Sequence, residues 1–220
     1  HPNFPISTGP VVYFGTGQFL GPPDITNTLV QSFYGVWDNA PTSPYTRSNL
    51  VQQILTDTTL NSVQVRLITN NTINWSTKFG WYIDLGSAVA AADAGERVIT
   101  DPRLENGTLV FTTYVPAANS CAIGGKAFLM AVNYKNGGSY AKPQLDINND
   151  GTLDSKDQTA SGQSPVGLFL GNVYASSPTI LSASLGNVKA VKLTTLSTGQ
   201  IRSVSEAGGN TGRISWWQVF

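Results

Sequence analysis

The sequence feature that restricts the fold most is a twelve-residue segment, Asp146 to Asp157. Oxygen-bearing side chains occupy its first, third, fifth, ninth and twelfth positions, and Gly151 occupies the sixth. This is the spacing of a calcium-binding loop of the EF-hand type. Calcium prefers six to eight oxygen ligands at about 2.3–2.6 Å, so alternate side chains must point inward before the backbone turns sharply. Gly151 permits that turn because glycine reaches positive φ at no steric cost.

The loop therefore predicts a Ca²⁺ site, and each ligand has an expected contribution. Thr152 would offer its backbone carbonyl, Asp154 a direct or water-mediated contact, and Asp157 a closing carboxylate. The full set of predicted ligands is Asp146, Asn148, Asp150, Thr152, Asp154 and Asp157. The spacing alone does not require flanking helices, and we expect none here.

A second interpretation of the same segment is a solvated turn between two strands, because Asp, Asn and Gly favour turns in general. Two observations favour the metal site. Ile147 and Leu153 stand where such loops need apolar anchors, and four of the thirteen acidic residues of the chain lie within the segment. Carboxylates about 4 Å apart repel each other by roughly 1 kcal/mol per pair in water, so the loop needs a cation.

The composition favours many short strands. With 220 residues, the chain is long enough for one domain or for a large part of a bigger one. Gly, Pro, Thr, Ser, Asn and Val are abundant, which suits an all-β fold with many turns. The formal net charge is zero and 12% of residues are charged, so the sequence gives no sign of binding to nucleic acid or to an anionic membrane. No apolar run approaches the ~20 residues of a membrane helix.

The single histidine and the single cysteine exclude several kinds of catalytic site. His1 lies at the terminus, which removes His-based triads and zinc sites, so we expect no enzymatic activity. In a secreted protein, Cys121 is either a buried thiol or bonded to a partner outside this segment. The chain opens at His1-Pro2 without an initiator methionine or a signal peptide, so we expect processing or truncation to have removed a preceding segment.

A weak internal repeat points to a propeller. Each unit consists of an apolar strand, a polar excursion and a second apolar strand that runs into Gly or Asn. The paired segments are residues 11–17 with 32–38, 109–114 with 127–132, and 178–183 with 188–193. Repeated all-β units of this kind indicate propeller blades, and roughly three blades are fewer than the usual minimum of about four for closure. We therefore expect residues 1–220 to be the C-terminal part of a longer, modified β-propeller; the alternative architecture is a β-sandwich.

Other residues give local expectations. Asn106-Gly107 predicts a tight hairpin turn, and residues 97–100 predict a short strand. Glu96, Arg97 and Asp101 are expected to form a surface ion-pair cluster of little energetic value. Tryptophans are expected to pack inside the blades and not to form a contact patch; those considered are Trp75, Trp81, Trp216 and Trp217.

A series of segments spread over nearly the whole chain follows the order of a known family. They are residues 12–20, 31–38, 80–85, 95–98, 109–113, Cys121 with Gly124 and Gly125, and residues 146–151, 176–181 and 212–216. Together they resemble the C-terminal domain of the PilC/PilY family of type IV pilus tip proteins. The resemblance implies a modified β-propeller with a calcium site in a loop of this spacing. The ligands that it carries over are Asp146, Asn148, Asp150, Thr152 and Asp154, whereas Asp157 lies beyond the family's shorter loop.

The same resemblance implies a function. It indicates a role at the pilus tip in surface attachment and in balancing pilus extension against retraction, and thus in twitching motility. The expected partners are pilin or minor pilins, the N-terminal part of the same protein, and a host or abiotic surface. The expected location is extracellular, at the cell surface on the pilus tip (the fimbrium) or in association with the outer membrane.

Two other functions fit parts of the sequence less well. A calcium-dependent extracellular carbohydrate- or protein-binding module would use the same loop, but dockerin-like modules pair two such loops with helices and this chain has one loop. A quinoprotein-type propeller enzyme would share the strand pattern at residues 12–17. Such enzymes need a cluster of ligands around a quinone and calcium, and the sequence shows no such cluster.

Overall fold

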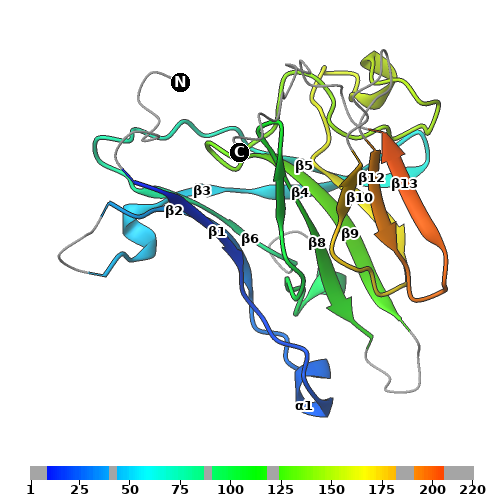
Figure 1. The fold of residues 1–220 in the computed structure, drawn as a ribbon, viewed down its shortest axis with the longest axis horizontal. Helices are drawn as coiled ribbons and strands as arrows, with labels where there is room; N and C mark the ends of the chain where they lie inside the picture. Colours follow the sequence, from blue (N-terminus) through cyan, green and yellow to red (C-terminus); the bar gives the residue numbers. More distant parts are fainter. Residues whose placement is uncertain (1–8, 40–43, 87–90, 118–123, 182–190, 206–220) are drawn as a thin grey trace, which may run out of the picture.

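The structure, a computed structural model, describes residues 9–39, 44–86, 91–117, 124–181 and 191–205. These residues form three β-sheets, with the six-stranded sheet between the other two (Figure 1). The first sheet contains, in spatial order, β1 (Val11–Gly15), β2 (Ser32–Trp37), β6 (Gly80–Asp84) and β3 (Val51–Gln53). The central sheet contains β4 (Leu55–Leu60), β5 (Val63–Ile68), β10 (Gly167–Gly171), β9 (Gly125–Asn133), β8 (Thr108–Pro116) and β7 (Arg103–Glu105). The third sheet contains β11 (Thr179–Leu181), β12 (Val191–Thr195) and β13 (Ile201–Ser205).

Helical structure in this part of the chain is confined to short segments. They are the single α-helical turn α1 (Pro22–Ile25) and the 3-10 turns η1 (Arg47–Asn49), η2 (Ala91–Asp93) and η3 (Ser155–Asp157). Across the described ranges, no helix has the length and apolar character needed to cross a membrane. The fold is mostly β, as the composition predicts.

The strand pairs of the predicted repeat are confirmed. β1 pairs antiparallel with β2, β8 with β9, and β11 with β12. Asn106 and Gly107 form the predicted hairpin turn between β7 and β8, with φ values of 48° and 81°. Local apolar alternation and turn chemistry therefore identify the pairing of neighbouring strands in this chain.

The predicted strand at residues 97–100 is wrong. Arg97 pairs with Tyr114 in an isolated bridge, while the N–H of Val98 donates to the carbonyl of Thr16 at 3.1 Å. The segment thus crosses between the central and the first sheet and extends neither of them. Strands β4, β7 and β10 have no counterpart in the sequence prediction, since β4 is rich in threonine, β7 has three residues and β10 is a short run bounded by glycines.

The central sheet is covered on both faces. On one face, Phe111 of β8 joins Phe33 and Trp81 of the first sheet in a buried cluster, where the ring centroids of Phe33 and Phe111 lie 3.9 Å apart. On the other face, Leu129 of β9 belongs to a second cluster that includes Val204 of the third sheet. The described residues are thus stacked as three layers and not as the two sheets of a sandwich.

Trp81 is fully buried, and two glycines make room for its ring. A Cβ at Gly35 or Gly137 would lie 2.5 or 2.4 Å from atoms of the indole, so a larger residue at either position would displace it. Trp75 is also buried, which confirms the predicted packing role for these two tryptophans. The predictions for His1, Cys121, Trp216 and Trp217 lie outside the described residues.

The predicted surface ion-pair cluster at Glu96, Arg97 and Asp101 is wrong. Glu96 and Arg97 are both buried, and they have different partners. Glu96 pairs with the guanidinium of Arg66 inside the core. Arg97 donates hydrogen bonds of 2.6–2.8 Å to the backbone carbonyl oxygens of Gln18, Asp24, Asn27 and Gly95. It thereby holds the connection between β1 and β2 in place.

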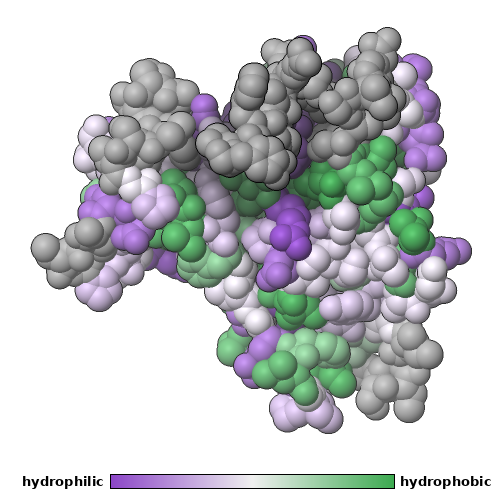
Figure 2. All heavy atoms as spheres, in the orientation of Figure 1, coloured by the Kyte–Doolittle hydropathy of each residue, from purple (hydrophilic) through white to green (hydrophobic). Residues whose placement is uncertain are grey.

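This connection, residues 16–31, projects from the first sheet and carries exposed apolar side chains. Leu20 and Leu29 are largely exposed, and Figure 2 shows hydrophobic residues gathered at this end of the molecule. Asp24 accepts from the backbone N–H of Leu20 at 2.7 Å, and the connection is also held by Arg97. The apolar side chains are therefore presented on a fixed loop.

The outer face of the first sheet carries exposed apolar side chains, and we expect isolated chains to associate with one another through it. Val12 and Phe14 of β1 are exposed on that face, and Phe14 begins a stacked aromatic row with Tyr34 and Tyr82. Exposed apolar faces and strand edges favour pairing with another chain. We expect the wild-type chain to form dimers or larger species at high concentration in analytical ultracentrifugation.

A charge-adding variant tests which surface associates. Val12→Lys combined with Phe14→Lys should shift the equilibrium towards monomer, because two lysines add charge to the apolar face. Leu20→Lys combined with Leu29→Lys adds the same charge to the projecting connection and serves as the comparison. A wild-type chain that sediments as a compact monomer at high concentration would contradict the prediction.

Candidate functional site

The predicted calcium loop lies between β9 and β10 and ends in the turn η3. It has no flanking α-helices, as expected from the sequence. Leu145 and Ile147 are buried in the cluster that contains Leu129 and Leu168 of the central sheet. The start of the loop is therefore anchored in the core, and the predicted anchoring role of Ile147 is confirmed.

The loop turns through two residues with left-handed backbone conformation. Asn149 has a φ of 59° and Gly151 a φ of 77°. A Cβ at Gly151 would meet no atom within 4 Å, so the requirement for glycine comes from the backbone and not from crowding. The sharp turn expected at the sixth position of the loop is present.

Two carboxylates of the loop are buried and organise its backbone. Asp157 is fully buried, and it accepts hydrogen bonds from the N–H groups of Ile147, Asn148 and Asp154 at 2.7, 3.4 and 3.2 Å. It thus ties the end of the loop to its beginning. Asp146 accepts from the N–H groups of Asp150 and Gly151 at 3.2 and 2.8 Å.

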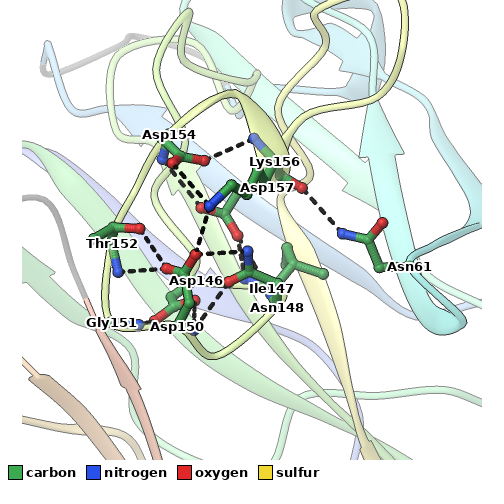
Figure 3. Close-up of polar contacts among 10 residues, drawn as sticks. All are labelled: Asn61, Asp146, Ile147, Asn148, Asp150, Gly151, Thr152, Asp154, Lys156 and Asp157. Atoms are coloured by element: carbon green, nitrogen blue, oxygen red, sulfur yellow. Dashed lines mark hydrogen bonds and ion pairs between the residues drawn. The ribbon is translucent and has the colours of Figure 1, made fainter.

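The other four predicted ligands form the rim of the loop, where Asp150 and Thr152 are exposed and Asn148 and Asp154 are half-buried. Figure 3 shows the contacts among these residues. Asp150 accepts from the hydroxyl and, at 2.8 Å, from the N–H of Thr152. These bonds hold the pKa of the Asp150 carboxyl below its usual value. The other carboxylate oxygen of Asp150 accepts from the side-chain amide of Asn148 at 3.0 Å, and Asp154 accepts from the N–H of Lys156 at 2.8 Å.

Lys156 belongs to this site, although the sequence prediction did not include it. Its Nζ lies 3.3 Å from Oδ2 of Asp150 and 3.8 Å from Oδ2 of Asp154. The hydrogen bond to Asp150 raises the pKa of the Lys156 ammonium. The sequence signal that could have identified Lys156 is its place as the eleventh residue of a loop rich in acidic side chains.

Asn61 is the second residue that the sequence did not reveal. It lies in the turn between β4 and β5, where Asn61 and Ser62 have φ values of 52° and 64°. Its side-chain amide donates to the carbonyl of Lys156 at 3.1 Å (Figure 3). This contact joins residues far apart in the chain, so no local pattern could indicate it. It links the loop to the central sheet.

The donor set fits a hard cation, because every predicted side-chain ligand offers oxygen. Across the described ranges, however, no three His, Cys, Asp or Glu side chains are grouped closely enough to hold a metal ion. The loop carboxylates bind backbone N–H groups, and the ammonium of Lys156 supplies positive charge at Asp150 and Asp154. Calcium binding at this loop stays a prediction.

The comparison with known proteins bears on the family. No protein-family model matches the chain. Two curated proteins of Xylella fastidiosa (strain Temecula1), each named type IV pilus biogenesis factor PilY1 homolog, are similar to it. One is 31% identical over 216 residues, which is 97% of this chain, and the other is 32% identical over 159 residues, which is 71% of it. The chain belongs to the PilY1 family of type IV pilus biogenesis factors.

The resemblance of the sequence to the PilC/PilY family is thereby confirmed. The chain spans 17% and 11% of the length of these two relatives, so it corresponds to a small part of a PilY1-type protein. A solved structure, the crystal structure of the Pseudomonas aeruginosa PilY1 C-terminal domain, matches it with a TM-score of 0.74 at 22% identity. The match covers 94% of this chain and 43% of that domain. The fold is therefore that of part of the PilY1 C-terminal domain, a β-propeller.

Proposed function

We propose that residues 1–220 are the C-terminal part of the propeller domain of a PilY1-type factor, and that they act at the tip of the type IV pilus. The supporting observation is a similarity to PilY1 homologs that extends over 97% of the chain, together with the fold match. The proposed role is surface attachment and control of pilus extension and retraction. The proposed location is extracellular, on the pilus tip or in association with the outer membrane.

The proposed partners follow from the same assignment. They are pilin or minor pilins, the N-terminal part of the same protein, and a host or abiotic surface. Val12 and Phe14 offer an exposed apolar patch on β1 for such contacts, beside the half-buried rings of Tyr34 and Tyr82. We propose no hydrolase or redox activity; turnover of an esterase, glycosidase or quinone-dye substrate above the level of an Asp150→Ala variant would contradict this.

The calcium part of the proposal rests on how the loop uses its carboxylates. A carboxylate has about four lone-pair sites. Asp157 uses three of them for backbone N–H groups, and Asp146 uses two, so both retain acceptor capacity towards an ion. We propose that these two buried groups fix the loop and that the exposed rim completes the shell.

The residues that would hold calcium are those that the spacing predicts. Asp146, Asn148, Asp150 and Asp157 would contribute side-chain oxygens, Thr152 its carbonyl, and Asp154 a direct or water-mediated contact. When bound, calcium would supply the positive charge that offsets repulsion among the carboxylates. Because Leu145 and Ile147 anchor the loop in the core, ion binding would stabilise the central sheet.

Calorimetric titration of the wild-type chain with calcium tests this proposal. We expect one ion per chain with a Kd on the order of 10⁻⁵ M, and weak binding of magnesium, which demands a tight octahedral shell. Asp150→Ala should abolish binding, whereas Asp101→Ala, which removes an exposed carboxylate outside the loop, should not. In the full-length protein, Asp150→Ala should leave folding intact and change surface motility. Absence of calcium binding by the wild-type chain would refute the proposal.

A further inference from the structure

Lys156 lies at the loop in a position to affect how calcium binds there, which rests on the calcium site proposed above. Its ammonium lies between Oδ2 of Asp150 and Oδ2 of Asp154, at 3.3 and 3.8 Å (Figure 3). Both carboxylates belong to the predicted ligand set. A single positive charge of the protein itself therefore contacts two of the predicted ligands.

For the ion to bind, the ammonium of Lys156 has to leave Asp150 and Asp154 and the ligand side chains have to close around the ion, whereas the backbone at Lys156 can stay in place. Its backbone is held on both sides, because its N–H donates to Asp154 at 2.8 Å and its carbonyl accepts from Asn61 at 3.1 Å. The side chain is 66% exposed, so it can turn into solvent without opening a cavity. The ammonium can therefore leave the two carboxylates without a change in the backbone at Lys156.

The ammonium of Lys156 has opposite effects on the metal-free loop and on the calcium-bound loop. Without a cation, Asp150 and Asp154 would repel each other and the two buried carboxylates of the loop. The ammonium reduces that repulsion in the metal-free state. In the ion-bound state the same ammonium would be repelled by a divalent cation a few ångströms away. Lys156 therefore stabilises one state of the loop and disfavours the other.

We propose that Lys156 is a built-in competitor of calcium: it occupies the ligand carboxylates of the metal-free loop and sets the calcium concentration at which the loop fills. The loop is then folded in both states, and calcium exchanges with an internal cation. Removal of the ammonium should tighten calcium binding and weaken the metal-free form.

The test compares Lys156→Gln with the wild-type chain and with Lys142→Gln. Lys142 is exposed, lies just before the loop and makes no ion pair within the described part of the chain, so its replacement removes the same charge without touching Asp150 or Asp154. In calcium titrations, Lys156→Gln should lower the Kd about three- to tenfold, the range that one or two exposed ion pairs support. Lys142→Gln should change the Kd less than twofold.

Melting temperatures distinguish competition between Lys156 and calcium from a general effect of removing one positive charge. In chelator, Lys156→Gln should melt at a lower temperature than the wild type, and in saturating calcium this difference should shrink or reverse. Equal affinities for Lys156→Gln and the wild type, with calcium bound by both, would overturn the role of Lys156 while leaving the calcium site intact. Absence of calcium binding by all three proteins would overturn the site itself, and the competitor with it.

Discussion

Replacing Arg66 with methionine is expected to lower the free energy of unfolding by about 3–5 kcal/mol. The guanidinium is fully buried; its Nε lies 2.9 Å from Asp57, its Nη2 lies 3.1 Å from Asp93, and its Nη1 pairs with Glu96. Methionine would retain much of the apolar volume but would leave Glu96 and Asp57 without their cation, whereas Asp93 would keep the ammonium of Lys126 at 2.6 Å. One carboxylate oxygen of Glu96 already has no hydrogen-bond partner in the described part of the chain, so the loss falls heavily on Glu96.

Thermal unfolding of Arg66→Met measures this cost. For a domain of this size about 2–4 °C of melting temperature corresponds to 1 kcal/mol, so we expect a decrease of about 10 °C or more. The matched control is Arg47→Met. Arg47 pairs with Asp84 at 2.9 Å, but its side chain is 47% exposed. This ion pair should therefore contribute about 1 kcal/mol or less to stability. Adding Glu96→Gln to Arg66→Met should recover part of the loss. A variant Arg66→Met that melts like Arg47→Met would show that the buried network does not stabilise the core.

Replacing Asp157 with alanine is expected to cost at least about 3 kcal/mol whether or not calcium is present. Asp157 is fully buried and is the acceptor for three backbone N–H groups, of which the bond from Ile147 is buried and the bonds from Asn148 and Asp154 are partly buried. A buried donor left without a partner costs about 1–3 kcal/mol, and the two partly buried bonds add to this loss. Asp150 is exposed on the rim of the loop, where water can replace its contacts. The two predicted ligands therefore differ in kind: Asp157 maintains the loop, and Asp150 is needed for the ion.

Melting curves recorded in chelator separate these roles. Asp157→Ala should melt well below the wild type under that condition, whereas Asp150→Ala should stay close to it, since exposed substitutions usually change stability by about 0.5 kcal/mol or less. If both variants lose the same stability in chelator, Asp157 has no structural role beyond that of an exposed loop residue.

Local sequence signals identified much of the fold. The apolar segments of the repeat and the Asn106-Gly107 turn predicted neighbouring strand pairs, because a hairpin is encoded by residues close together in the chain. The charged residues after residue 95 were misassigned. Glu96 was expected at the surface, but its partner Arg66 lies on a strand of another part of the chain, and burial of that pair depends on tertiary packing.

At the calcium loop too, local features were predictable from the sequence and contacts that depend on tertiary packing were not. The spacing from Asp146 to Asp157 predicted a turn with glycine at its sixth position, and the structure has that turn. The spacing could not reveal that Asp157 also closes the loop by accepting backbone N–H groups. It could not reveal the contact from Asn61 either, because that contact depends on the packing of the loop against the turn of β4 and β5.

The measurement that tests the central claim most directly is thermal unfolding of the wild-type chain in millimolar calcium and in chelator, with Asp150→Ala alongside. An ion that binds the folded form alone stabilises it by about 2.7 kcal/mol when its concentration exceeds the Kd a hundredfold. We therefore expect calcium to raise the melting temperature of the wild type by several degrees and to leave that of Asp150→Ala unchanged. Coincident wild-type curves in calcium and in chelator would contradict the calcium site.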